Sequence, residues 1–209
     1  LNGKVWVGRN FDNRIGSYTM VEAMRQVGDT PVDVYAVSTV QEEVGLRGAR
    51  ASAFGVAPDI GIAIDGSMAR QAYGSDKGNL CEPGQGTGIY IRDNLTIGHP
   101  KLVKYIFELC EKRGIAHQGN IGGGTDASAM QQSRAGVIAT TIGAPVRYMH
   151  ATGQLCHADD MDATVALLVG MMETANAFYD TLMDPASCFG GFAKPRGLDD
   201  GLHGQGIQR

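Results

Sequence analysis

Stretches with the hydrophobic pattern of β-strands alternate along the chain with stretches that have the pattern of α-helices. The strand-like stretches are short and rich in β-branched or small apolar residues, and they cover residues 5–7, 33–40, 61–64, 88–91 and 135–142. Apolar residues at helical spacing occupy residues 15–27, 102–112 and 161–178. This alternation predicts an α/β domain, a three-layer sandwich with a mixed, mostly parallel sheet between helices.

Three stretches predict particular local structure. Residues 33–40 (DVYAVSTV) form a nearly continuous apolar run, which is typical of a strand buried on both faces. The amphipathic stretch 102–112 is followed by Arg113 and Gly114, a suitable C-cap for a helix. After residue 183 the sequence becomes Gly-rich and loses its periodicity. We therefore expect one domain over residues 1–183 and an extended tail over residues 184–209.

Charge and hydropathy argue against two classes of function. The 209 residues carry a net charge of −4, whereas nucleic-acid binding needs a clustered basic surface. The longest apolar stretch, near residues 166–172, is much shorter than the roughly 20 residues that span a bilayer. No nucleic-acid or membrane partner is therefore expected. Four cysteines without CxxC spacing predict reduced thiols and a cytoplasmic protein, and they are Cys81, Cys110, Cys156 and Cys188.

Acidic residues and a histidine follow several of the predicted strands. Asp12 comes after the first strand, Glu42 and Glu43 after the second, and Asp65 after the third. His150 follows the strand at residues 135–142 after a short loop. Because the ends of parallel strands meet at one edge of a sheet, these side chains are expected to converge. Carboxylates with imidazole are the ligand set of a catalytic zinc, cobalt or manganese site.

The adjacent residues Glu42 and Glu43 are expected to have two different roles, because neighbouring side chains at a strand end point in different directions. One of them can bind metal while the other faces the substrate as a general base. Each residue also has a plainer interpretation: the pair as a solvated acidic turn, Asp12 as a helix N-cap, and His150 as a partly buried structural histidine. Their occurrence together favours the metal site. We assign structural roles to the remaining candidates His99, His117 and His157.

Other catalytic motifs are missing from the sequence. There is no G-x-S-x-G nucleophile elbow, and no cysteine has an activating sequence context. The glycines at residues 84–88 lack the strand and helix of a nucleotide-binding loop. A glycine turn at residues 122–126 leads into a predicted helix and could approach a substrate backbone.

Five segments together resemble the tetrahedral aminopeptidases, the glutamyl-aminopeptidase-like metallopeptidases that are often labelled cellulases. The segments are FDNRIG (11–16), VSTVQEEVGLRGA (37–49), AIDGS (63–67), GGGTDAS (122–128) and IGAPVRYMHA (142–151). They occur in the family's order between about residues 4 and 178. The resemblance implies a zinc-exopeptidase-like fold and a two-metal enzyme that removes N-terminal residues from short peptides.

The resemblance also implies a role for each matching residue. Asp12 would bridge two divalent ions (zinc, cobalt or manganese), Glu43 and His150 would complete one site, and Asp65 would bind the other ion. Glu42 would be the general base that activates the attacking water and then protonates the leaving amine. Beside these roles, the glycine turn predicts substrate contacts at Gly124, Thr125 and Asp126. Arg147 could either face the substrate or pair with a carboxylate of the site.

Two parts of the family pattern are not found in this sequence. The family carries a further histidine ligand, in a His-x-Asp segment before the DNR motif, and an inserted β-rich domain that forms dimers. The sequence therefore resembles the C-terminal half to two-thirds of a member, and we expect its second metal site to be weaker than the first. The family forms twelve-subunit tetrahedral shells, so a homo-oligomer is expected, although a dodecamer would depend on the insert.

Two alternative functions remain open from the sequence. A non-catalytic or incomplete member could keep the fold and serve an assembly role, in which case loss of Glu42 would have no effect. Another hydrolase, such as a metal-dependent deacylase, could use the same residues. A glycosidase is a weaker alternative, since it would use two carboxylates without metal and would be insensitive to a chelator.

Overall fold

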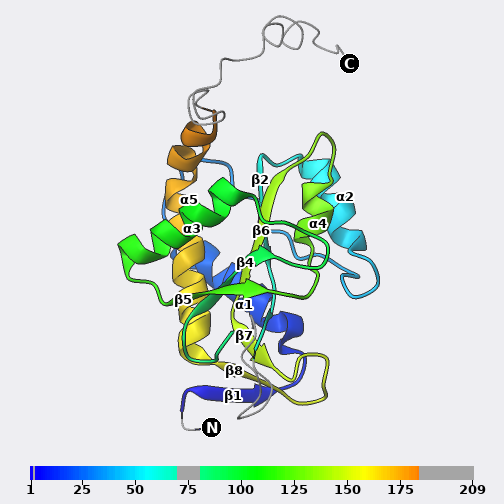
Figure 1. Ribbon diagram of the computed structural model, residues 1–209, viewed down its shortest axis with the longest axis vertical. Helices are drawn as coiled ribbons and strands as arrows, with labels where there is room; N and C mark the ends of the chain where they lie inside the picture. The colour runs from blue at the N-terminus through cyan, green and yellow to red at the C-terminus, as the bar shows by residue number, and fades with distance from the viewer. Residues whose placement is uncertain (2, 70–80, 184–209) are drawn as a thin grey trace, which may run out of the picture.

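The computed structural model describes residues 1, 3–69 and 81–183 (Figure 1). The predicted tail at residues 184–209, with Cys188, lies outside the described residues. The helices and strands follow one another in this order: β1 (Val5–Gly8), α1 (Phe11–Gln26), α2 (Arg47–Val56), β2 (Ile60–Ile64), β3 (Ser67–Met68), β4 (Thr87–Arg92), α3 (Pro100–Arg113), β5 (His117–Ile121), α4 (Ala127–Gln131), β6 (Ile138–Gly143), β7 (Pro145–Arg147), β8 (Gln154–His157) and α5 (Ala158–Met183).

The central sheet has four strands in the order β2-β6-β4-β5. β2 pairs with β6 in parallel, as does β4 with β5, whereas β4 and β6 are antiparallel. The sequences of β2 (IGIAI) and β6 (IATTIG) lack charged residues, as expected for strands in a sheet that is covered on both faces. The prediction of a mixed, mostly parallel sheet is confirmed.

Helices lie on both faces of this sheet. α5 runs along most of the molecule, and α1 and α3 pack against it, while α2 and α4 lie on the other side (Figure 1). The core between the sheet and the first group contains fully buried side chains from β4, α3, β6 and α5, among them Ile89, Leu102, Ile106, Ile142 and Leu167. The three-layer arrangement is therefore confirmed. No helix among the described residues combines the length and the apolar character needed to cross a membrane.

A second, smaller sheet was not predicted from the sequence. Its strands have the order β1-β8-β7-β3, and β1 pairs antiparallel with β8. The predicted strand at residues 5–7 therefore exists, but it belongs to this second sheet rather than to the central one. β3, β7 and β8 contain two to four residues each, too few to show a clear alternating pattern.

The prediction of a buried strand at residues 33–40 is wrong for this structure. The segment has no strand assignment, and its side chains are largely exposed, with Tyr35 at 67% and Val40 at 66% exposure. A strand needs a neighbouring strand that satisfies its backbone groups. Among the described residues no strand pairs with this segment.

Two predicted local features are confirmed. α3 ends at Gly114, which adopts a left-handed conformation (φ 65°) and donates its N–H to the carbonyl oxygen of Cys110. The described cysteines Cys81, Cys110 and Cys156 are free and buried. Burial raises the pKa of the Cys81 thiol to about 12, which keeps it protonated and unreactive.

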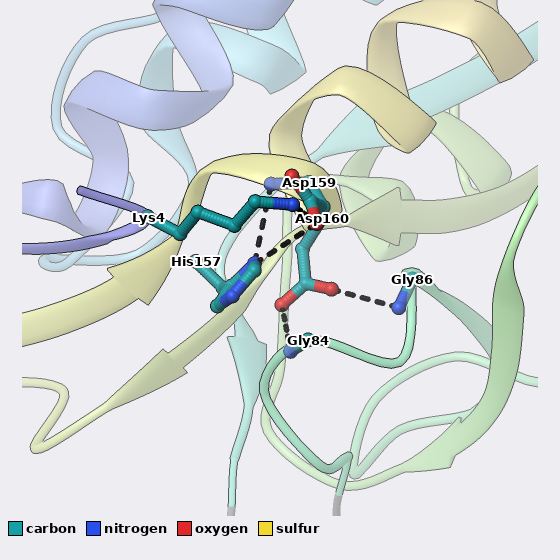
Figure 2. A network of polar contacts seen from close by, with 6 residues as sticks. All are labelled: Lys4, Gly84, Gly86, His157, Asp159 and Asp160. Atoms are coloured by element: carbon teal, nitrogen blue, oxygen red, sulfur yellow. Dashed lines mark hydrogen bonds and ion pairs between the residues drawn. The ribbon is translucent and has the colours of Figure 1, made fainter. Parts of the chain in front are cut away.

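A buried carboxylate joins the start of α5 to the turn that precedes β4 (Figure 2). Asp160, with no exposed surface, accepts hydrogen bonds of 2.7 Å from the backbone N–H groups of Gly84 and Gly86. Gly86 has φ 98°, and a Cβ there would lie 2.1 Å from the carbonyl carbon of Ala116, so only glycine fits. The adjacent Asp159 instead forms an exposed ion pair with Lys4 at 2.7 Å.

The Asp160→Ala variant is expected to lose about 2–5 kcal/mol of unfolding free energy, because two inward-facing N–H groups lose their acceptors. For a chain of this size, each kcal/mol of unfolding free energy that is lost lowers Tm by about 2–4 °C. Differential scanning calorimetry measures the change. Asp159→Ala is the matched control and should leave Tm nearly unchanged, since its ion pair with Lys4 is exposed. Equal shifts in the two variants would contradict a structural role for the buried carboxylate.

Candidate metal centre

Asp12, Glu43 and His150 bring two carboxylates and an imidazole together. Asp12 lies in the first turn of α1, Glu43 in the turn before α2, and His150 in the loop between β7 and β8. Nε2 of His150 is 3.0 Å from Oδ2 of Asp12 and 3.4 Å from Oε1 of Glu43. The three ligand atoms lie within 4.8 Å of one another, which is compact enough to hold one metal ion. The predicted convergence of these residues is thus present in the structure.

Hydrogen bonds between side chains and backbone groups position the start of α1 beside the end of β2. The N–H of Asp12 donates to Oε1 of the buried Gln154 at 2.9 Å. The side-chain amide of Asn13 donates to the carbonyl oxygen of Ile64 at 2.7 Å. Gly16 is required here, since a Cβ would lie 2.6 Å from that same carbonyl oxygen. Gln154 was missed by sequence reasoning, because it belongs to a strand of the unpredicted second sheet.

The carboxylates of this region are destabilised in their ionised form. Burial, and then the nearby Glu43, raise the pKa of Asp12, and His150 partly offsets this. Burial and the nearby Asp12 raise the pKa of Asp65 well above its usual range, although the carboxylate accepts the N–H of Gly66 at 2.7 Å. A bound divalent cation would relieve both the burial cost and the mutual repulsion. The residues present therefore fit a metal ion by charge, by ligand type and by spacing.

Glu42 has a different environment from its neighbour. Burial raises its pKa to about 7, and repulsion from Asp126, Glu43 and Asp12 contributes in that order. It does not belong to the group of converging ligand atoms, which contains Glu43 instead. A carboxyl group with a pKa near neutrality is suited to accept and return a proton. The assignment of one residue of this pair to metal and of the other to proton transfer stays a prediction.

Asp126 connects the segment before Glu42 to the start of α4. Its Oδ2 accepts a hydrogen bond of 2.6 Å from the hydroxyl of Thr39, three residues before Glu42. Its other oxygen, Oδ1, is buried and has no hydrogen-bond partner among the described residues. Burial raises the pKa of Asp126, and the bond from Thr39 partly offsets this. Thr39, which no sequence pattern singled out, thus anchors the chain next to the candidate base.

A cavity of about 1180 Å³ lies beside the metal-ligand group. Five acidic residues are among those that line it, and they are Asp12, Glu42, Glu43, Asp65 and Asp126. Its remaining walls come from α1, residues 31–39, α2, β2 and the C-terminal part of α5. The volume exceeds the roughly 300–1,000 Å³ of most small-molecule pockets, so a peptide could enter.

The other predicted substrate contacts lie outside the lining of this cavity. The hydroxyl of Thr125 is buried and is 2.6 Å from that of Thr141. Gly124 is exposed and lies near Leu95. The guanidinium of Arg147 is 5.2 Å from the ring centre of Tyr148. Contact of Gly124, Thr125 and Arg147 with substrate stays a prediction.

Comparison with known proteins gives a consistent result. The family model for M42 glutamyl aminopeptidases matches residues 1–167. A lysyl aminopeptidase of Pyrococcus furiosus is 40% identical over 167 residues, which cover 78% of this chain and 47% of the relative. The chain spans about half the length of the curated relatives it matches.

Solved structures show the same similarity in three dimensions. An aminopeptidase from Desulfurococcus kamchatkensis superposes with a TM-score of 0.80 at 36% identity, covering 83% of this chain and 50% of that one. The TET1 peptidase of Pyrococcus horikoshii, which can assemble into a tetrahedron or a large octahedral shell, superposes with a TM-score of 0.69 at 31% identity, covering 82% and 51%. With the family model matching most of its length, this chain belongs to the M42 glutamyl aminopeptidase family.

Proposed function

We propose that the protein is a metal-dependent aminopeptidase that removes N-terminal residues from short peptides. The observation that carries this proposal is the grouping of Asp12, Glu43 and His150 at a cavity that Glu42 also lines. Membership of the M42 family supports the same conclusion. A purely structural role is not favoured, because it would require neither a ligand group nor a carboxyl group with a pKa near 7.

Asp12, Glu43 and His150 would hold the first metal ion, and their oxygen and nitrogen donors suit zinc, cobalt or manganese. A divalent ion, when bound there, lowers the pKa of water and polarises a peptide carbonyl. Asp65, with Asp12, would contribute to a second ion. Asp12 would be shared with the first ion, so Asp65 is the one further residue assigned to the second. Because the first ion has three assigned ligands and the second has two, we propose that the second ion binds more weakly.

Glu42 would move the proton in peptide hydrolysis. In its ionised form it removes a proton from the attacking water while the oxygen adds to the scissile carbonyl carbon. It then delivers that proton to the leaving nitrogen as the C–N bond breaks, so that the free amine departs and Glu42 is ionised again. Its pKa of about 7 suits both transfers near neutral pH.

Asp126 is the proposed substrate contact with the most support. Its Oδ1 is buried and has no hydrogen-bond partner in the described part of the chain, and the residue lines the same cavity as Glu42. An ionised carboxylate with a free oxygen attracts a cation, and the free α-ammonium group of a peptide is such a cation. Gly124, Thr125 and Arg147 are retained as further proposed contacts.

The proposed assembly is a homo-oligomer built from the domain at residues 1–183. Support comes from the Pyrococcus horikoshii TET1 peptidase, which can assemble into a tetrahedron or a large octahedral shell. Analytical ultracentrifugation of the purified chain gives the number of subunits directly.

Hydrolysis of matched peptides tests the proposed activity. The metal-free chain is supplied with zinc, cobalt or manganese and then given leucyl dipeptides with a free or an acetylated amino terminus. We expect metal-dependent cleavage of the free peptides only, since an aminopeptidase requires the terminal ammonium group. Equal cleavage of the acetylated peptides would instead favour a deacylase or an endopeptidase.

The Asp126→Asn variant is expected to shift the acid limb of the pH profile to lower pH. Glu42 must be ionised to act as a base, so kcat/KM falls as the pH drops through its pKa. After burial, the charge of Asp126 is the largest cause of the raised pKa of Glu42, so removing that charge lowers this pKa. Profiles between pH 5 and 9 for the wild type, Asp126→Asn and the exposed control Asp162→Asn measure the shift. An unchanged acid limb in Asp126→Asn would rule out this coupling.

A further inference from the structure

A second hydrophobic cluster, separate from the main core, contains the chain neighbours of two proposed metal ligands. Phe11 directly precedes Asp12, and Met149 directly precedes His150. Both apolar side chains are partly buried and pack against the same buried residues, which are Ile15, Ala144, Val146, Cys156 and Met161. Asp12 and His150 therefore come from two segments that are anchored in one apolar cluster.

The side chain of Met149 also covers the turn that follows Asp65. A Cβ on the buried Gly66 would lie 2.9 Å from Cε of Met149, so this methyl group packs directly on the glycine. The N–H of Gly66 in turn donates to Oδ1 of Asp65 at 2.7 Å. Met149 thus adjoins His150 in the chain and contacts the turn of Asp65 in space.

The backbone on both sides of Met149 has an unfavourable conformation. Tyr148 and His150 adopt positive φ angles of 57° and 63°. The N–H of Ala151 donates to the carbonyl oxygen of Tyr148 at 3.0 Å, which closes a turn over these residues. Residues other than glycine keep such angles only where the surrounding structure holds them. Met149 lies between the two strained residues, so its packed side chain can hold this turn in place.

We propose that Met149 is a positioning residue of the metal centre. Its side chain, fixed between the second cluster and Gly66, holds His150 with Nε2 toward Asp12 before any metal binds. Ligands that are already in place lose less conformational freedom when they bind, so the metal binds more tightly. The inference rests on the proposed function in one respect, since it takes Asp12, Glu43 and His150 as metal ligands.

Backbone dynamics of the metal-free chain test the anchoring without metal or catalysis. We expect an NMR order parameter of about 0.85 for the His150 amide in the wild type and below about 0.6 in Met149→Ala. Met149→Leu restores an apolar side chain of similar volume and should keep the wild-type value. A His150 amide that is as ordered in Met149→Ala as in the wild type would overturn the proposal.

Zinc affinity tests the consequence of the anchoring. Isothermal titration is carried out well below the Tm of every variant. We expect Met149→Ala to bind Zn²⁺ about 10–100-fold more weakly, the usual effect of losing a residue that orients a metal ligand. Met149→Leu should bind as the wild type does.

Met161→Ala is the matched control, because Met161 belongs to the same cluster and is only 2% exposed. It should lower Tm at least as much as Met149→Ala does, yet leave zinc affinity unchanged. Equal losses of affinity in the two variants would contradict a positioning role, since affinity would then follow overall stability. Wild-type affinity in Met149→Ala would contradict it as well.

Failure of the proposed function would look different from failure of this inference. A wild-type chain that binds no zinc would refute the proposed metal centre, whereas the order parameters of the metal-free chain would still decide whether Met149 anchors His150. Conversely, wild-type zinc affinity in Met149→Ala would leave the metal ligands and Glu42 in their proposed roles.

Discussion

Replacing Glu42 with Gln is expected to lower kcat for peptide hydrolysis by about 10²–10⁴-fold, the usual contribution of a positioned general base. Glutamine has a similar size and can still form hydrogen bonds, but it cannot accept a proton from water. The residue lies outside the group of converging ligand atoms, so metal affinity should change little. Steady-state kinetics with a leucyl-p-nitroanilide substrate, with metal in excess, measures the loss.

The exposed residue Glu111 provides a matched control for this substitution. Glu111→Gln removes the same charge at the C-terminal end of α3 and should leave kcat unchanged. Circular dichroism of both variants checks that the fold is intact. Full activity of Glu42→Gln would mean that another residue is the base, or that the hydrolysis does not need one.

Replacing His150 with Ala is expected to weaken binding of the first zinc ion by more than about 100-fold. Loss of a residue that only orients a metal ligand typically lowers metal affinity about 10–100-fold. In His150→Ala the ligand itself is lost, so the effect should be larger. Nε2 of His150 is the one nitrogen donor of the group and lies 3.0 Å from Asp12. Isothermal titration of the metal-free protein with Zn²⁺ measures the affinity.

His117→Ala is the control for the histidine substitution. The ring of His117 contacts the carbonyl oxygen of Ile115 at 2.8 Å and takes no part in the ligand group. Its removal should leave zinc affinity unchanged. If His150→Ala bound zinc as tightly as the wild type, the assignment of Asp12, Glu43 and His150 as a metal centre would be wrong.

Strongly patterned elements could be predicted from the sequence. β2 and β6 are apolar and β-branched over most of their length, and α3 combines amphipathic spacing with a glycine C-cap, so local preference and tertiary structure agree. The convergence of Asp12, Glu43 and His150 was expected from strands that end at one edge of a sheet. In the structure residues 33–40 form no strand and β1 belongs to the second sheet, so the residues meet for a different reason. The resemblance to the family added an order of ligands that the pattern alone left open.

Elements whose structure depends on a distant partner could not be predicted. Residues 33–40 have the composition of a buried strand, but no strand among the described residues pairs with them to satisfy their backbone groups. β3 and β7 are too short to show a pattern, and they exist because they pair with each other. Gln154 and Thr39 each support the candidate metal centre through one hydrogen bond, and no local sequence pattern predicts either bond.

The central claim is that this chain hydrolyses peptides through a metal centre at Asp12, Glu43 and His150. The most direct test follows leucyl-p-nitroanilide hydrolysis by the metal-free chain while zinc is added in steps, and then adds a chelator. The account predicts no hydrolysis without metal, a rise that follows occupancy of the tight site, and loss of activity with the chelator. Hydrolysis that persists in the metal-free chain, or whose rate the chelator does not change, would contradict the account.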